Sequence, residues 1–207
     1  MKNKERFFTI ITWLFIIAAA AAHYQYDPWG FYWNISEEEA AKRLDYVVTA
    51  EHWLGLREMD GSHMTIVDIY NAHEPLAQGY AVTSSDSWCA AFVSAAAIEA
   101  ELTDLIPTEC SCERQIGLWQ EMNCWEEKDR TIPLPGDLIY YNWDQKKPGE
   151  NNGWADHVGI VVGTKWPFMK VIEGNYDDQV KYRILFIGDF RIRGYGKPDY
   201  TMASKTA

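Results

Sequence analysis

The sequence predicts an α+β fold in which N-terminal helices pack on a small antiparallel sheet. Apolar residues recur with roughly helical spacing in the first part of the chain, and short apolar runs typical of strands follow residue 133. Helices first and strands afterwards are typical of the α+β class. The chain has 207 residues, 47% hydrophobic and 24% charged, which is enough for one sizeable domain with a packed core.

The predicted elements follow this order along the chain. Ser36 opens a capping box, so we expect a helix over 37–55. A shorter helix or turn is expected around 66–69, and further helices over 88–101 and 111–122. Small side chains in the helix over 88–101 would allow it to pack closely across strands. Strands are predicted over 138–141, 157–162, 170–173 and 181–186.

The first 22 residues have the features of a targeting element. A basic start precedes an apolar run over 7–22, and Ala20 and Ala22 fit a cleavage site before His23. The run is slightly short for a bilayer span of about 20 residues. A cleaved signal peptide, an uncleaved membrane anchor and a buried core helix all remain open. The first two give a secreted or extracytoplasmic domain.

The remaining chain divides into a linker over 23–36, a catalytic-size domain over 37–200 and a flexible tail over 201–207. The formal net charge is −11, and no basic stripe is present, which argues against nucleic-acid binding. The same charge argues against attachment to an anionic wall or membrane surface by bulk charge, so a shaped groove would have to recognise any wall substrate. We expect a monomer.

Four cysteines are present. If the chain is exported, a disulfide among Cys110, Cys112 and Cys124 is compatible with their spacing, but the connectivity is open. These three could also suggest zinc ligands, but they form no C-x-x-C pair and have no nearby histidine. No acidic loop has the spacing of a calcium site. We therefore expect no metal and no cofactor, and any pair among the three leaves Cys89 free.

Cys89 follows a polar cluster and begins a small-residue helix. Ser85, Asp86 or Ser87 can act as the N-cap of that helix. The helix dipole is positive at this end, which favours thiolate over thiol and prepares a nucleophile. The alternative is a buried structural cysteine, because free cysteine often packs as a small apolar residue.

Two further polar positions lie at strand ends. His157 opens an apolar strand, and Glu173 and Asn175 are two residues apart, so both project from one face if their strand continues. Taken alone, His157 could be a structural histidine, and Glu173 and Asn175 could mark a solvated strand end. Together with Cys89 they supply the nucleophile, base and orienting group of a papain-type site.

Four motifs then occur in order: DSWCAAFV at 86–93, PGDLIY at 135–140, DHVGIV at 156–161 and IEGN at 172–175. With the closing IRGYGKP at 192–198, the chain resembles the CHAP family of cysteine, histidine-dependent amidohydrolases/peptidases over roughly 40–200. This resemblance implies a papain-like fold and cleavage of peptidoglycan at the muramoyl–alanine amide or a peptide cross-bridge.

By position, the resemblance implies that Cys89 is the nucleophile, His157 the base, Glu173 the orienting residue and Asn175 a polar companion. A papain-like secreted peptidase acting on protein and a wall-binding module without turnover are the alternatives. Tyr80, Ser84 and Ser85 are candidates for an oxyanion donor from the loop before Cys89. Aromatic residues near the motifs are candidates for a substrate groove, although Trp143 and Trp154 are favoured over the others, which are expected in the core: Trp88, Tyr140 and Tyr141.

Overall fold

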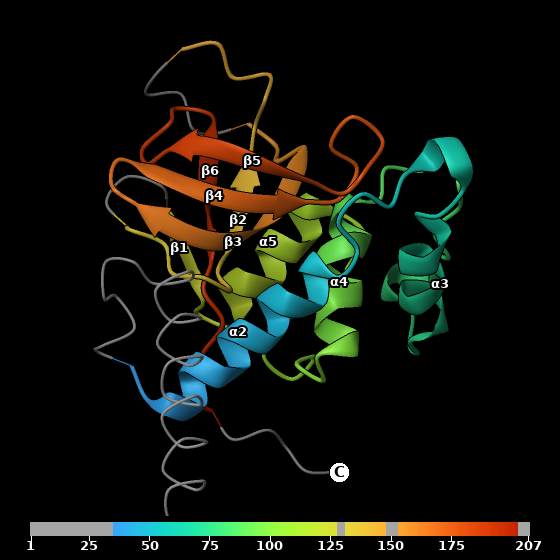
Figure 1. Cartoon of the computed structure of the whole chain (residues 1–207), viewed down its shortest axis with the longest axis horizontal. Helices are drawn as coiled ribbons and strands as arrows, with labels where there is room; N and C mark the ends of the chain where they lie inside the picture. Colours follow the sequence, from blue (N-terminus) through green and yellow to red (C-terminus); the bar gives the residue numbers. More distant parts are fainter. Residues whose placement is uncertain (1–34, 128–130, 148–152, 203–207) are drawn as a thin grey trace, which may run out of the picture.

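The computed structural model describes residues 35–127, 131–147 and 153–202 (Figure 1). The predicted targeting element, most of the linker and the end of the tail lie outside these residues. The helices are α2 (Glu37–Glu51), α3 (Met64–Ala72), α4 (Cys89–Glu99) and α5 (Cys112–Glu121), with short 3-10 turns η2 (Glu58–Asp60) and η3 (Ala77–Gly79). The strands are β1 (Trp125–Glu127), β2 (Leu138–Tyr141), β3 (His157–Lys165), β4 (Phe168–Glu173), β5 (Lys181–Phe186) and β6 (Ile192–Gly196). The α+β prediction is confirmed.

The strands form one sheet in the order β1-β6-β2-β3-β4-β5, and all neighbours are antiparallel. The sequence prediction missed β1 and β6. The IRGYGKP segment supplies β6, which lies inside the sheet between β1 and β2. Side chains alternate between faces: Leu138 and Tyr140 join the core on the helix side, and Ile139 and Tyr141 join a second apolar cluster.

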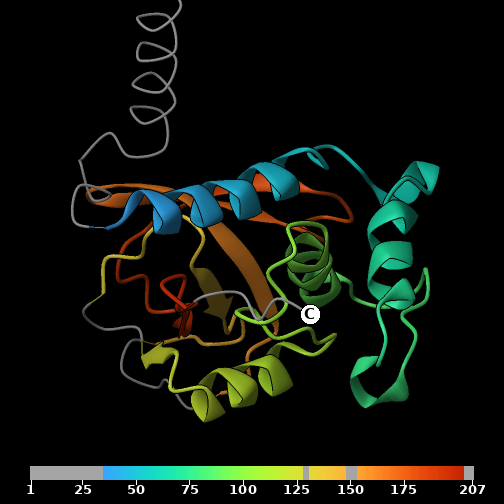
Figure 2. The ribbon, with the colours of Figure 1, turned by 90° about the horizontal axis from the view of Figure 1, so that it is seen from below.

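The helices gather around α4. Every residue from Cys89 to Ala97 is buried, which confirms that the small side chains of this segment allow close packing. In Figure 2, α2 and α5 lie on either side of α4, and α3 packs along it. None of the helices in the described ranges is long and apolar enough to cross a bilayer.

The first helix has the predicted start but ends earlier than predicted. Ser36 is the N-cap of α2, and its hydroxyl accepts a hydrogen bond from the Glu39 backbone N–H at 3.1 Å. The helix ends at Glu51. The chain then turns through Gly55, which has φ +90° and donates its N–H to Val180 O, so the last residues of the predicted helix form a turn instead.

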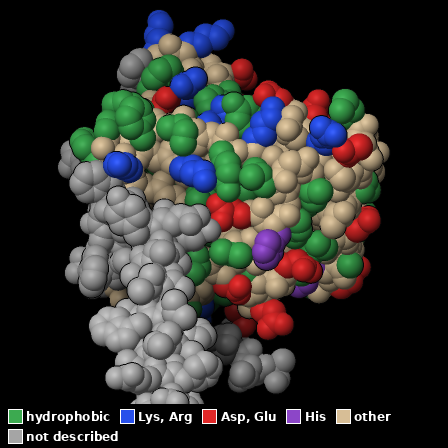
Figure 3. Space-filling model, in the orientation of Figure 1, with side chains coloured by type: hydrophobic (Ala, Val, Ile, Leu, Met, Phe, Trp, Pro, Cys, Tyr) green, Lys and Arg blue, Asp and Glu red, His purple; other side chains and the backbone are tan. Residues whose placement is uncertain are grey.

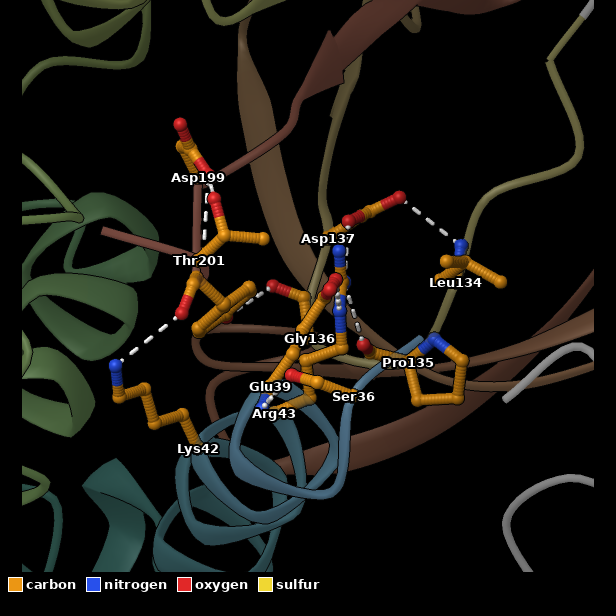
Figure 4. A network of polar contacts seen from close by, with 11 residues as sticks. Ser36, Glu39, Lys42, Arg43, Leu134, Pro135, Gly136, Asp137, Asp199 and Thr201 are labelled. Atoms are coloured by element: carbon orange, nitrogen blue, oxygen red, sulfur yellow. Dashed lines mark hydrogen bonds and ion pairs between the residues drawn. The ribbon is translucent and has the colours of Figure 1, made fainter. Parts of the chain in front are cut away.

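A buried ion network joins α2 to the start of β2 (Figure 4). Arg43 Nη1 lies 2.8 Å from Asp137 Oδ1 and donates to Pro135 O at 3.0 Å, and its Nε donates to Glu39 Oε1 at 2.8 Å. Asp137 is fully buried, and burial raises the pKa of its carboxyl although Arg43 opposes this. The PGD part of the second motif therefore has a structural role here.

Removing the Arg43 cation leaves a carboxylate buried without its partner. We expect Arg43→Met to lower the free energy of unfolding by about 3–5 kcal/mol, measured by urea unfolding. Arg57→Met is the matched control, because Arg57 and Asp60 form an exposed ion pair and the midpoint should hardly move. Equal midpoint shifts in the two variants would contradict the structural role given to Asp137.

Candidate active site

Cys89, His157 and Glu173 meet at one end of the sheet. His157 is the first residue of β3 and Glu173 the last residue of β4. Because the two strands are antiparallel neighbours, these ends lie side by side, and His157 Nε2 is 3.0 Å from Glu173 Oε2. Cys89, the first residue of α4, lies close enough to His157 for each group to shift the pKa of the other. With Nε2 directed at the carboxylate, Nδ1 is the imidazole nitrogen left for the thiol.

Two glycines allow this convergence. A Cβ at Gly159 would lie 2.7 Å from Glu173 Cγ, so the bare backbone of β3 lets the Glu173 side chain cross it toward His157. A Cβ at Gly174 would lie 2.4 Å from Phe92 Cβ in α4. The missing side chain at Gly174 therefore brings the start of α4 against the end of β4.

The Cys89 thiol is set up to ionise although it is only 4% exposed. The pKa of Cys89 is held well below its ordinary value, and the largest cause is the hydrogen bond with Cys112. Burial acts in the opposite direction, and the interaction with His157 helps to outweigh it. The Val158 backbone lowers the pKa of Cys89 further, to a smaller extent. The expected thiolate is therefore consistent with the geometry.

The imidazole is held in its charged form. Burial opposes a charged ring, but the hydrogen bonds and charges of Cys89 and Glu173 raise the pKa of His157 to about 10. Burial likewise opposes the charged form of Glu173, and the hydrogen bonds from His157 and Arg183 outweigh it, so the pKa of this carboxyl is lowered. The three shifts therefore all favour the charged forms: thiolate, imidazolium and carboxylate.

Sequence reasoning missed Arg183. This β5 residue lies diagonally across from Glu173, and its Nε is 2.8 and 2.9 Å from the two carboxylate oxygens. The guanidinium carbon also lies 3.7 Å from the ring centroid of Tyr176 and 4.6 Å from that of Trp143. Arg183 thus holds the carboxylate that also contacts His157. Its spacing in the sequence gave no signal, because the contact depends on strand register.

Cys112 is the second residue that the sequence did not place at the site. It begins α5, and its Sγ lies 3.7 Å from Cys89 Sγ. All four cysteines are free in the structure, so the suggested disulfide among Cys110, Cys112 and Cys124 is not formed there. The nearest thiol to Cys112 is the candidate nucleophile itself.

The predicted helix cap is wrong. The N-cap of α4 is Trp88, and it makes no side-chain capping bond. Asp86 instead accepts hydrogen bonds from the backbone N–H and the hydroxyl of Thr83 and from the hydroxyl of Tyr80. The first-turn amides of α4 therefore have no side-chain cap, which leaves the Cys89 N–H available to a substrate oxygen.

The other predicted site residues have different environments. Trp88, a groove candidate for which a core position was favoured, is fully buried and donates its indole N–H to Glu58, so it belongs to the core and does not line a substrate groove. Trp143 is half-buried and stacks on Tyr141, whose ring also stacks on His157, so Trp143 is one ring removed from the site. Trp154 is 77% exposed on the loop before β3.

Two of the smaller predictions also change with the geometry. Glu173 and Asn175 would share one strand face only if β4 continued to Asn175. β4 ends at Glu173, and Asn175 has a left-handed backbone with φ 57°, so the two residues do not share a strand face. Tyr80 is half-exposed and directs its hydroxyl to Asp86 at 2.9 Å. Tyr80 therefore supports the loop before Cys89 and has its hydroxyl engaged there.

No protein-family model matches the chain, and no curated protein does. The solved structures that are similar to it include two of Ly7917. One is the crystal structure of Ly7917, with a TM-score of 0.44 and 13% identity over 76% of this chain and 62% of that chain. The other is the crystal structure of Ly7917 with the hydrolyzing product of MDP, with a TM-score of 0.37 and 15% identity over 53% of each chain. The chain thus spans less than two thirds of either, and its CHAP resemblance stays a prediction from sequence motifs.

A cavity of about 490 Å³ lies apart from these residues, between Glu51 of α2 and the β3–β4 hairpin. Trp166, Phe168 and Ile184 line it and are 63, 48 and 62% exposed. Figure 3 shows hydrophobic side chains beside Lys and Arg side chains over this part of the molecule. Cys89, His157 and Glu173 are not among the lining residues, so the chemistry is assigned to the sheet end and not to this cavity.

Arg183 makes a prediction that needs no substrate. Arg183→Met removes a cation from Glu173, and a carboxylate that loses such a neighbour has its pKa raised by about 1–3 units. We expect NMR titration of isotope-labelled glutamate carboxyls to show this rise for Glu173. Arg191→Met is the matched control, because Arg191 also lies over Trp143 but pairs with Asp189. An unchanged Glu173 titration in Arg183→Met would contradict the assignment.

Proposed function

We propose that this chain is an exported cysteine hydrolase that cleaves an amide bond in the peptide part of peptidoglycan. The observation that carries the proposal is the convergence of Cys89, His157 and Glu173, with a depressed thiol pKa and a 3.0 Å contact between His157 and Glu173. These groups supply the nucleophile, acid–base and orienting group of amide hydrolysis. The substrate class rests on the ordered motifs and their resemblance to the CHAP family.

The residues support a two-step mechanism. The Cys89 thiolate attacks the scissile carbonyl carbon and forms a C–S bond, and the oxyanion accepts a hydrogen bond from the uncapped N–H of Cys89. His157 then donates its proton to the leaving nitrogen as the C–N bond breaks, which leaves a thioester on Cys89. Neutral His157 takes a proton from water, the hydroxide attacks the thioester, and Cys89 leaves as thiolate.

Glu173 has a positioning role in these steps. Its carboxylate holds the ring through Nε2, so that Nδ1 faces the sulfur throughout the cycle. Arg183 keeps that carboxylate ionised and in place. The imidazolium of the resting site, which forms again when His157 takes a proton from water, is therefore stabilised by a fixed negative charge.

Parallel digestions of purified peptidoglycan and casein test the function. We expect soluble muropeptide products from peptidoglycan, and mass spectrometry of their new amino termini will name the bond: a free amino terminus on alanine marks the muramoyl amide, and one within the bridge marks an endopeptidase. Cleavage of casein without peptidoglycan products would replace the proposal with a protein-directed peptidase. No product from either, with an unreactive Cys89, would support a binding module.

A further inference from the structure

Two thiols face each other in the site. Cys89 begins α4 and Cys112 begins α5, and their sulfur atoms are 3.7 Å apart. A disulfide bond is about 2.05 Å long, so the sulfurs need to approach by about 1.7 Å, a movement that small side-chain rotations can supply. The two side chains come from separate helices, and the residues are 4 and 8% exposed. A small oxidant can therefore reach the sulfurs, whereas a bulky one cannot.

The two sulfurs have different protonation states. Cys89 is the thiolate, for the reasons given above. The hydrogen bond with that thiolate, together with burial, raises the pKa of Cys112 well above its ordinary value, so Cys112 keeps its proton. An ionised thiol reacts with peroxides, and a neighbouring thiol can then resolve the product. The other thiols are differently placed: Cys110 Sγ is directed to Glu109, 3.6 Å away.

We propose that Cys89 and Cys112 are an oxidative modification site, in which a peroxide converts the two thiols into a reversible disulfide that withdraws the nucleophile. Cys89 thiolate attacks one oxygen of hydrogen peroxide, which gives a sulfenic acid and a hydroxide that takes a proton from His157. Cys112 sulfur then gives up its proton to His157 and displaces the second hydroxide, which leaves as water once protonated. Two thiols and one peroxide become one disulfide and two waters, with both sulfurs oxidised and both peroxide oxygens reduced.

The consequence for the enzyme is protection as well as inhibition. A sulfenic acid without a resolving thiol is oxidised further to a sulfinic acid, which a dithiol does not reduce. A disulfide is reduced back by a dithiol such as dithiothreitol. The inhibition part of this inference rests on the proposed function, whereas formation of the bond does not.

The bond is tested by peptide mapping of the full chain after treatment with hydrogen peroxide. A glutamate-specific protease cuts after Glu99 and Glu109, so it separates Cys89 from Cys112. A Cys110→Ser background leaves Cys112 as the sole cysteine of its fragment. We expect a disulfide-linked pair of fragments that disappears on reduction. Absence of that pair, with Cys89 present as sulfinic acid, would overturn the proposal.

Activity separates the switch from the function. Peroxide-treated wild type should lose its peptidoglycan hydrolysis and regain most of it with dithiothreitol, and Cys124→Ser should behave like wild type. Cys112→Ser keeps a hydroxyl donor beside Cys89 but lacks the resolving thiol, so its loss should persist after reduction. Equal recovery of wild type and Cys112→Ser would overturn the switch. If the untreated protein hydrolyses nothing and the linked fragments still form, the proposed function fails and the modification site stands.

Discussion

Cys89→Ala is expected to abolish peptidoglycan hydrolysis while the fold persists. The substitution removes the sulfur that forms the thioester, and loss of a nucleophile of this kind lowers kcat on the order of 10⁴- to 10⁶-fold. Alanine is compatible with the position, because Cys89 begins a helix whose next two residues are alanine and it packs in the core. Clearance of a peptidoglycan suspension measures the rate, and thermal unfolding measures the fold.

Cys124→Ala is the matched control for this substitution. Cys124 is a half-buried free thiol outside the described site, so the variant should keep the wild-type rate. Replacing one thiol in each protein removes the same atoms, which leaves position as the difference between them. Wild-type clearance by a folded Cys89→Ala protein would rule out the thioester mechanism.

The sequence was sufficient to predict the three central residues because each carries a local signal. Cys89 follows a polar cluster and begins a small-residue helix, and His157 and Glu173 lie at the ends of apolar runs. Strand direction then brings the last two together, since the end of one antiparallel strand lies beside the start of its neighbour. The α+β class could be predicted because helical spacing of apolar residues gives way to short apolar runs after residue 133.

The supporting residues carry no such local signal. Arg183 reaches Glu173 through the register of β4 on β5, and Cys112 reaches Cys89 through the packing of two helix ends. The spacing of these residues along the chain indicates neither contact. For Trp88, beside the nucleophile, the sequence leaves a groove and a core position open and favours the core, and in the structure the residue is fully buried and bonded to Glu58.

His157→Ala should remove both hydrolysis and the low-pH reactivity of Cys89. Hydrolysis loses its general acid and base, which typically costs about 10²- to 10⁴-fold in rate. The thiolate also loses the hydrogen bond and positive charge of the imidazolium, so the pKa of Cys89 rises, although the bond with Cys112 still opposes this rise. In wild type the thiolate–imidazolium pair exists above the lowered pKa of Cys89 and below a pH of about 10, where His157 deprotonates.

The rate of alkylation by iodoacetamide measures the fraction of Cys89 that is ionised, and it requires no substrate. This rate tests the prediction. Wild-type Cys89, identified by mass spectrometry, should react nearly as fast at pH 6 as at pH 8, because its lowered pKa keeps it ionised. An isolated thiol with a pKa of about 8.5 would instead react more slowly as the pH falls from 8 to 6. His157→Ala should react about tenfold more slowly at pH 6, which is the loss expected when the thiol pKa lies about one unit above that pH. His63→Ala is the control, because His63 is a buried histidine whose ring packs at a tilt against Trp88. Profiles that coincide for wild type and His157→Ala would show that the imidazole does not hold the thiolate, and the assignment of His157 as acid and base would fall with it.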